Sequence, residues 1–261
     1  MKNFIAFLLS LLLNCSCTTA HIRRNYNLRI TNLSYLQPFS PFFVMVHSPR
    51  VDPIFTFGEQ ASSALTALAE TGDPSSLVAL YERVRGVYSV EVFDTGAPYL
   101  PGDSFDLPVQ TRGHRNRITI ASMATNTNDC FVAINGERLR WGDELLLPGL
   151  DAGSEVNDEV CENIPGPACG EGSGSPGNGE GFVHVHRGVQ GVGNLTKSSY
   201  DWRNGLMKVE VRGDRDNLFE EETVDALEAS ESPSMASSMP PSEEPSVLPS
   251  IAWSVSPTAL P

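Results

Sequence analysis

Short segments in which apolar and polar residues alternate recur along this chain, with turn-forming residues between most of them. The two-residue period of a strand with one buried face is seen in residues 26–33, 89–93, 105–109 and 117–125. Residues 42–47 instead form a continuous apolar run, which suits a strand buried on both faces. Several short strands separated by turns favour an antiparallel β-sandwich. We therefore expect a mostly β fold of about eight strands.

Further strands and one helical insertion are predicted from the rest of the pattern. The remaining predicted strands are residues 131–134, 145–147, 182–186 and 207–212. Asn135-Gly136 is a dipeptide typical of two-residue hairpin turns, so we expect the chain to reverse there. Residues 59–70 are rich in Ala and Leu at helical spacing and end at Gly72, and Asp73-Pro74 then begins a second short helix. We expect this helical pair to serve packing alone.

The two ends of the chain differ in composition from residues 21–213, which we expect to form the β-sandwich domain. Residues 1–20 have the pattern of a secretory signal peptide: Lys2, an apolar run of about ten residues, and small residues for cleavage. The run is shorter than the ~20 residues that span a bilayer. An uncleaved anchor is an alternative, as is a lipoprotein cysteine at Cys15 or Cys17, although Leu13-Asn14 lacks the usual small residue. We expect a secreted, extracellular protein without a transmembrane span.

Charge is concentrated in the last segment of the chain. The formal net charge is −14, and residues 214–261 hold ten acidic residues against Arg215. Such a balance argues against nucleic acid as a partner. The segment is rich in Ser and Pro and lacks an apolar period, so we expect an acidic, disordered tail. One hypothesis makes this tail the functional part, as a wall- or mineral-associated segment.

Three cysteines lie outside the predicted signal peptide. Cys161 and Cys169 flank a short loop rich in turn-forming residues, and in an oxidising compartment we expect them to form a disulfide. Cys130 stands where a strand is expected to begin, which suits a buried thiol. The count is therefore odd, and Cys130 is left without a partner.

Three carboxylates at predicted loop ends suggest a site for a hard divalent cation. Asp129 follows three oxygen-bearing residues at a loop-to-strand junction, and Asp151 and Glu155 lie on either side of Gly153. Calcium takes six to eight oxygen ligands, and a glycine permits a tight loop in which both side chains face one point. On spacing alone, however, three acidic loop residues are usually solvated side chains and nothing more.

Two histidines offer a second kind of metal site. His184 and His186 are two residues apart on a predicted strand, so their side chains share a face and could form half of a zinc or copper site. His47, His114 or a carboxylate would have to supply a third ligand, and a structural pair bound to carbonyl groups is the alternative. The chain has no Gly-x-Ser-x-Gly nucleophile motif and no phosphate-binding loop motif. We therefore expect a protein that is not an enzyme.

Several motifs, in order along the chain, carry a resemblance to a known family. They are Leu28–Pro41, Val46–Pro49, Phe57–Glu59, Leu68–Asp73, Ser122–Val132, Leu150–Glu155, Val183–His186 and Asp201–Asn204. Together they resemble the spondin domain, most closely its short forms outside animals, over about residues 26–212. The resemblance implies a β-sandwich, an extracellular location and bound calcium. In animal members the domain goes with matrix attachment and cell adhesion, which implies an extracellular protein or glycan as partner.

The resemblance also names candidate calcium ligands. Animal members hold the ion with aspartates of a Ser-Pro-Asp-Trp motif and an Asp-Ala-Gly-Thr-Asp motif. Carried over by position, these ligands are Asp129, Asp151 and Glu155. The match departs from the family at Asn128-Asp129-Cys130, which replaces a Pro-Asp-aromatic stretch, and at Glu155, which replaces Asp. No thrombospondin-type repeat accompanies the domain, so the adhesion role transfers less directly than the ion.

Overall fold

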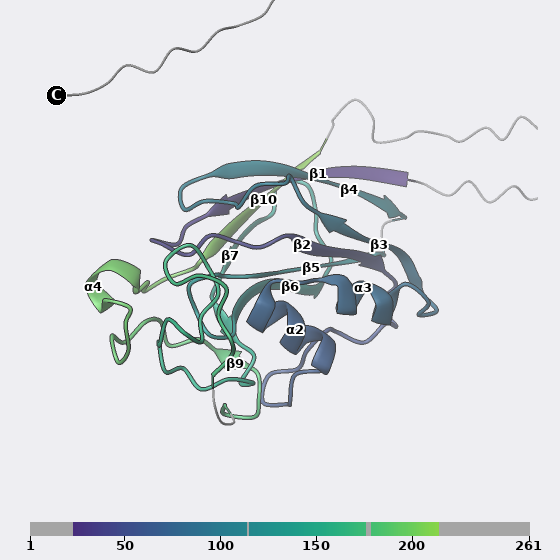
Figure 1. The fold of residues 1–261 in the computed structure, drawn as a ribbon. Coiled ribbons are helices and arrows are strands. Elements are labelled where there is room, and N and C mark those ends of the chain that lie inside the picture. The colour runs from purple at the N-terminus through teal and green to yellow at the C-terminus, as the bar shows by residue number, and fades with distance from the viewer. Residues whose placement is uncertain (1–22, 114, 176–178, 214–261) are drawn as a thin grey trace, which may run out of the picture. The chain divides into compact units, whose positions relative to one another are not determined.

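The computed structural model describes residues 23–113, 115–175 and 179–213 (Figure 1). Contacts divide the chain into two units, Met1–Glu222 and Thr223–Pro261, and every described residue lies in the first. The predicted signal peptide at 1–20, the acidic tail at 214–261 and His114 lie outside the described residues.

Two antiparallel sheets form the fold, as the alternating pattern predicted. One sheet has the order β4-β1-β10-β7, with β1 Arg23–Asn32, β4 Ser104–Arg112, β7 Glu144–Leu147 and β10 Met207–Gly213. The other has the order β3-β2-β5-β6-β8-β9, with β2 Phe42–His47, β3 Val87–Phe93, β5 Arg117–Met123, β6 Cys130–Glu137, β8 Leu150–Asp151 and β9 His184–Val185. Figure 1 shows β1, β4 and β10 layered over β2, β5 and β6. The prediction of a mostly β sandwich is confirmed, with ten strands rather than about eight.

The core lies between the two sheets and is centred on aromatic side chains. Phe42 is fully buried and meets the rings of Phe39 and Tyr99 edge to face, with centroids 5.9 and 5.2 Å away. Phe105 of β4 lies 5.4 Å from Phe42, which joins the two sheets. Aromatic pairs in these arrangements contribute about 0.5–1.5 kcal/mol each beyond the area that they bury. Residues of β4 alternate between more buried and exposed positions. Every residue of β2 is buried, because a second layer covers the outer side of that strand.

That second layer is the helical insertion. Helices α2 (Ser63–Thr71) and α3 (Ser75–Tyr81) lie on the outer face of the six-stranded sheet (Figure 1). Leu65 and Leu68 of α2 share a buried cluster with Phe43 and Met45 of β2. Ser62 caps α2 by accepting a hydrogen bond from the Leu65 amide, so the helix begins later than the predicted residue 59. A third, four-residue helix is α4, Lys197–Tyr200.

None of the described helices is long and apolar enough to cross a membrane.

The predicted hairpin turn at Asn135-Gly136 is wrong, because both residues lie inside β6. The Asn135 side chain accepts from the Ile54 amide at 3.0 Å and donates to the Phe55 carbonyl at 2.9 Å, so it joins β6 to a distant segment. The chain reverses instead between β5 and β6, in residues 124–129. Asp129 lies at the end of this connecting loop, directly before β6.

A shorter β9 is the other difference from the predicted strands. Only His184 and Val185 pair with β8, within the predicted segment 182–186. Residues between β8 and β10 therefore form long connections with little regular structure. The disulfide between Cys161 and Cys169 lies in these connections, and Cys130 is buried and free, as predicted.

Replacing Phe42 by Ala is expected to lower the free energy of unfolding by about 3–5 kcal/mol, because it empties the aromatic core. Leu100→Ala is the control, since Leu100 is about half exposed; it is expected to change stability by no more than about 0.5 kcal/mol. Urea denaturation of both variants measures the difference. Equal midpoints for the two would contradict this description of the core.

Candidate metal centre

Three neighbouring strands bring the predicted site residues to one edge of the six-stranded sheet. Cys130 of β6 lies opposite Asp151 of β8, and Asp151 lies opposite His184 of β9. Residues directly opposite in a sheet place their side chains on the same face. Asp129 precedes Cys130, and its carbonyl accepts from the Ala152 amide at 3.3 Å. Asp129, Asp151 and His184 are therefore neighbours although 55 residues separate the first from the last.

The Asp129 carboxylate is fully buried and only half satisfied. Its Oδ2 accepts three hydrogen bonds, from the Ser154 amide at 2.8 Å, the Ser154 hydroxyl at 3.2 Å and the Glu155 amide at 3.1 Å. Its Oδ1 is buried without a hydrogen-bond partner among the described residues. Buried polar atoms without partners are rare, because each loses the hydration of that atom. This oxygen is available to act as a ligand atom for a cation.

Without a positive charge nearby, the buried carboxylates at this edge of the sheet repel each other. Burial and the charge of Asp151 together raise the pKa of Asp129 to about 7, although the hydrogen bonds from Glu155 and Ser154 act to lower it. Burial also raises the pKa of Asp151, and the hydrogen bonds from Asn157 and Gly153 together with His184 oppose that shift. We call these two carboxylates the Asp129–Asp151 pair. A divalent cation would remove the repulsion between them.

Asp151 is held in a fixed orientation. Its Oδ1 accepts from the Gly153 amide at 2.8 Å, and its Oδ2 accepts from the Asn157 side-chain amide at 2.8 Å. Gly153 has φ +66°, and a side chain there would meet the backbone of Phe182. The prediction that a glycine permits this tight loop agrees with this geometry.

Glu155 belongs to the same loop, but its carboxylate points to a different set of neighbours. Its Oε2 accepts from the Ser175 hydroxyl at 3.4 Å. Burial, together with the charges of Glu70 and Asp129, raises the pKa of Glu155 to about 7. Among the described residues, the single group of three that brings one ligand atom from each side chain within 4.8 Å is Asp151, Glu180 and His184. The structure thus collects Asp129, Asp151 and Glu155 in adjoining loops without closing all three around one point.

The two predicted histidines have different environments. His186 is buried and stacks on Trp202 with ring centroids 5.1 Å apart. Its Nδ1 accepts from the Gly188 amide at 2.9 Å, which leaves the proton on Nε2 to be donated to Asn157 Oδ1 at 3.0 Å. Burial lowers the pKa of His186 to about 3, so the ring is neutral. Both of its nitrogens are used in hydrogen bonds, and His186 has none left for a metal.

His184 has a nitrogen left for a ligand. Its Nδ1 lies 2.9 Å from the Val185 carbonyl, so Nδ1 carries a proton, and in the neutral ring Nε2 carries the lone pair. Nε2 is buried without a hydrogen-bond partner and lies 3.6 Å from Asp151 Oδ1 and 3.7 Å from Glu180 Oε2. Burial alone would lower the pKa of His184, but the Val185 carbonyl and the charges of Asp151 and Glu180 outweigh burial and raise it.

Two residues of this edge were missed by the sequence prediction. Glu180 approaches His184 from the connection that follows the disulfide, and no local pattern in the sequence marks it. Asn157 bridges Asp151 and His186 through its amide nitrogen and oxygen. Its role depends on a tertiary contact, so no local pattern marks it.

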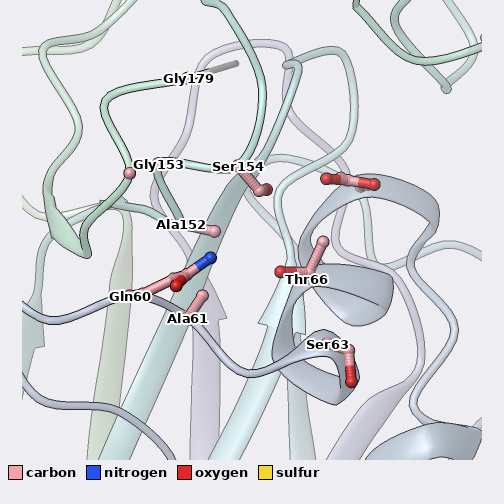
Figure 2. A pocket seen from close by; sticks show the side chains of 10 residues that line it. Gln60, Ala61, Ser63, Thr66, Ala152, Gly153, Ser154 and Gly179 are labelled. Carbon is pink, nitrogen blue, oxygen red and sulfur yellow. The ribbon is translucent and has the colours of Figure 1, made fainter. Parts of the chain in front are cut away.

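A polar cavity of about 490 Å³ lies on the other side of the 152–154 loop. Figure 2 shows it between Ser63 and Thr66 of α2 and the loop residues Gly153, Ser154 and Gly179. Its size lies within the range of small-molecule sites. Ser154 both lines this cavity and donates to Asp129, so the cavity and the carboxylates share one loop.

A scan against models of protein families finds no match for this chain, and a search of curated proteins finds no similar sequence.

In calcium-free solution, stability is expected to fall as the pH rises from about 5 to 8. Asp129 and Glu155 have pKa values of about 7 in the folded chain and about 4 when unfolded. The folded state therefore binds more protons across this window, so raising the pH favours unfolding. Melting temperatures measured in EDTA at several pH values test this.

Asp129→Asn is the matched variant for that measurement. An amide keeps an oxygen for the Ser154 and Glu155 donors but cannot ionise. We expect a shallower pH dependence than in the unchanged protein. A slope identical to that of the unchanged protein would contradict the assigned role of the Asp129 carboxylate.

Proposed function

We propose that this chain is a secreted, calcium-binding β-sandwich module of the spondin type, which acts in extracellular binding or adhesion and not in catalysis. The proposal rests on one observation: Asp129 Oδ1 is buried without a partner while Asp151, a second buried carboxylate, raises the pKa of the same group. Removing two carboxylates from water without a countercharge costs several kcal/mol. A bound cation offsets that cost.

Calcium is the cation that suits the proposed ligand set. Asp129, Asp151 and Glu155 offer carboxylate oxygens, and calcium accepts such ligands in irregular geometries together with carbonyl groups and water. A smaller ion such as magnesium demands near-ideal octahedral geometry. Asp129 lies before β6, Asp151 in β8 and Glu155 in the loop that follows, and amides hold the Asp151 carboxylate in one orientation. This irregular arrangement favours the more tolerant ion.

The consequence of calcium binding would be mechanical. Asp129 already fastens the 152–155 loop to the start of β6 through Ser154 and Glu155. An ion shared with Asp151 would hold the same loop from its other end. The polar cavity beside Ser154 and Gly153 would then keep a defined shape. We propose that this surface contacts an extracellular protein or glycan partner.

Export is supported by the chemistry of the connections. The Cys161–Cys169 disulfide suits an oxidising compartment. The signal-peptide pattern in residues 1–20 agrees with the same location.

The earlier alternative, a zinc or copper site formed by His184 and His186, is disfavoured by a specific contact pattern. Both nitrogens of His186 are engaged with Gly188 and Asn157, so the pair offers one free nitrogen rather than two.

Calcium is expected to stabilise the purified protein, and EDTA to reverse the effect. At a calcium concentration of 100 times Kd, binding contributes about 2.7 kcal/mol, which corresponds to about 5–10 °C in melting temperature for a domain of this size. Differential scanning calorimetry with calcium and with EDTA measures the shift.

Two variants make this test specific. Asp129→Asn is expected to abolish the calcium response because it removes a ligand charge while leaving the hydrogen-bonded oxygen. Glu162→Gln is the control, since Glu162 is an exposed carboxylate on the disulfide loop, and its response should match that of the unchanged protein. Superimposable melting curves in calcium and EDTA would refute the proposed function.

A further inference from the structure

We propose that Asp151, Glu180 and His184 form a second metal site, which takes zinc or a similar divalent transition-metal ion rather than calcium. This site differs from the proposed calcium site in its ligands, although the two share Asp151. It also differs from the His184/His186 pair considered from the sequence, because His186 takes no part. We call the three residues the Asp151–Glu180–His184 cluster.

The spacing of the ligand atoms carries the proposal. His184 Nε2 lies 3.6 Å from Asp151 Oδ1 and 3.7 Å from Glu180 Oε2, and the three atoms all lie within 4.8 Å of one another. These separations are too long for hydrogen bonds. Zinc binds nitrogen and oxygen ligands at about 2.1 Å, so a tetrahedral ion separates its ligand atoms by about 3.4 Å. The two distances from His184 Nε2 are therefore close to the separation between ligand atoms of a bound zinc ion.

The His184 ring is already oriented to bind a metal ion. Its Nδ1 proton faces the Val185 carbonyl at 2.9 Å, which fixes the ring and directs the Nε2 lone pair toward the two carboxylates. Histidines that bind metals usually donate their other nitrogen to a carbonyl or carboxylate in this way. Nε2 is buried and has no other partner among the described residues. Without an ion, this nitrogen makes no hydrogen bond in exchange for the hydration that it has lost.

Asp151 is also supported by residues behind it. Asn157 donates to its Oδ2, and Asn157 is in turn held by the buried His186. His186, which cannot itself bind a metal, therefore acts as a positioning residue in a chain that runs from Gly188 through His186 and Asn157 to Asp151. Such outer partners tune the affinity of a metal site.

The composition of the cluster selects the kind of ion. Imidazole nitrogen is a ligand for zinc, copper, iron and nickel, whereas calcium prefers oxygen ligands throughout. Three protein ligands leave a fourth position for water. The His184 and Glu180 side chains are 27% and 36% exposed, so solvent can reach that position and the ion can exchange. Zinc is the ion to test first.

The experiment is a zinc titration of the metal-free full chain by calorimetry, in a buffer without calcium, because the two proposed sites share Asp151. One equivalent of zinc is expected to bind, and His184→Gln and Glu180→Gln are each expected to weaken it at least about 100-fold. Glu162→Gln removes an exposed carboxylate from the same long connection and should bind zinc like the unchanged protein.

Further measurements separate this proposal from the proposed function. Asp129→Asn should lose the calcium response of the melting temperature and keep the zinc site. His184→Gln should do the reverse, and its retained calcium response also shows that it is folded. Zinc binding of equal strength in His184→Gln and the unchanged protein, or no zinc binding by the metal-free unchanged protein, would overturn the second site without bearing on the first.

Discussion

Two carboxylates are buried near one edge of the six-stranded sheet. Asp129, directly before β6, and Asp151 of the neighbouring β8 are both fully buried. A sandwich normally buries apolar side chains, and Phe131 and Leu150 beside them do so. The charged residues are tolerated because amides of the 153–157 segment surround them. The conformation of residues 153–157 is therefore fixed by hydrogen bonds to two carboxylates rather than by strand pairing.

The same principle extends over the long connections between β8 and β10. Asn128 donates to Asp158 and to Ser175, and Glu159 accepts from three successive amides that begin at Gln190. Side chains thus replace the missing strand ladder as partners for backbone groups. The small apolar cluster of Ile164, Val189 and Leu195 adds little burial by comparison with the central core. Order in this region depends on polar contacts that act together, and each one positions the next.

Much of the fold could be predicted because its information is local. Alternation in β4 and the apolar run of β2 follow directly from which faces are covered. The turn predicted at Asn135-Gly136 was wrong because the Asn135 side chain bonds to the 54–55 segment, which is 80 residues away along the chain. For the site, Asp129 and Asp151 could be found by motif likeness, whereas Glu180 could not. Its approach to His184 depends on the path of an irregular connection, which no periodic pattern encodes.

The free thiol of Cys130 lies next to the buried carboxylates, and this position limits its reactivity. Its thiol is fully buried, and burial together with the charges of Asp151 and Asp129 raises its pKa well above the usual value. Thiol–disulfide exchange proceeds through the thiolate, which this setting suppresses. Among the described residues, Cys161 and Cys169 form the disulfide and Cys130 is free. Once β6 has formed, the buried Cys130 thiol is therefore poorly able to exchange with that bond.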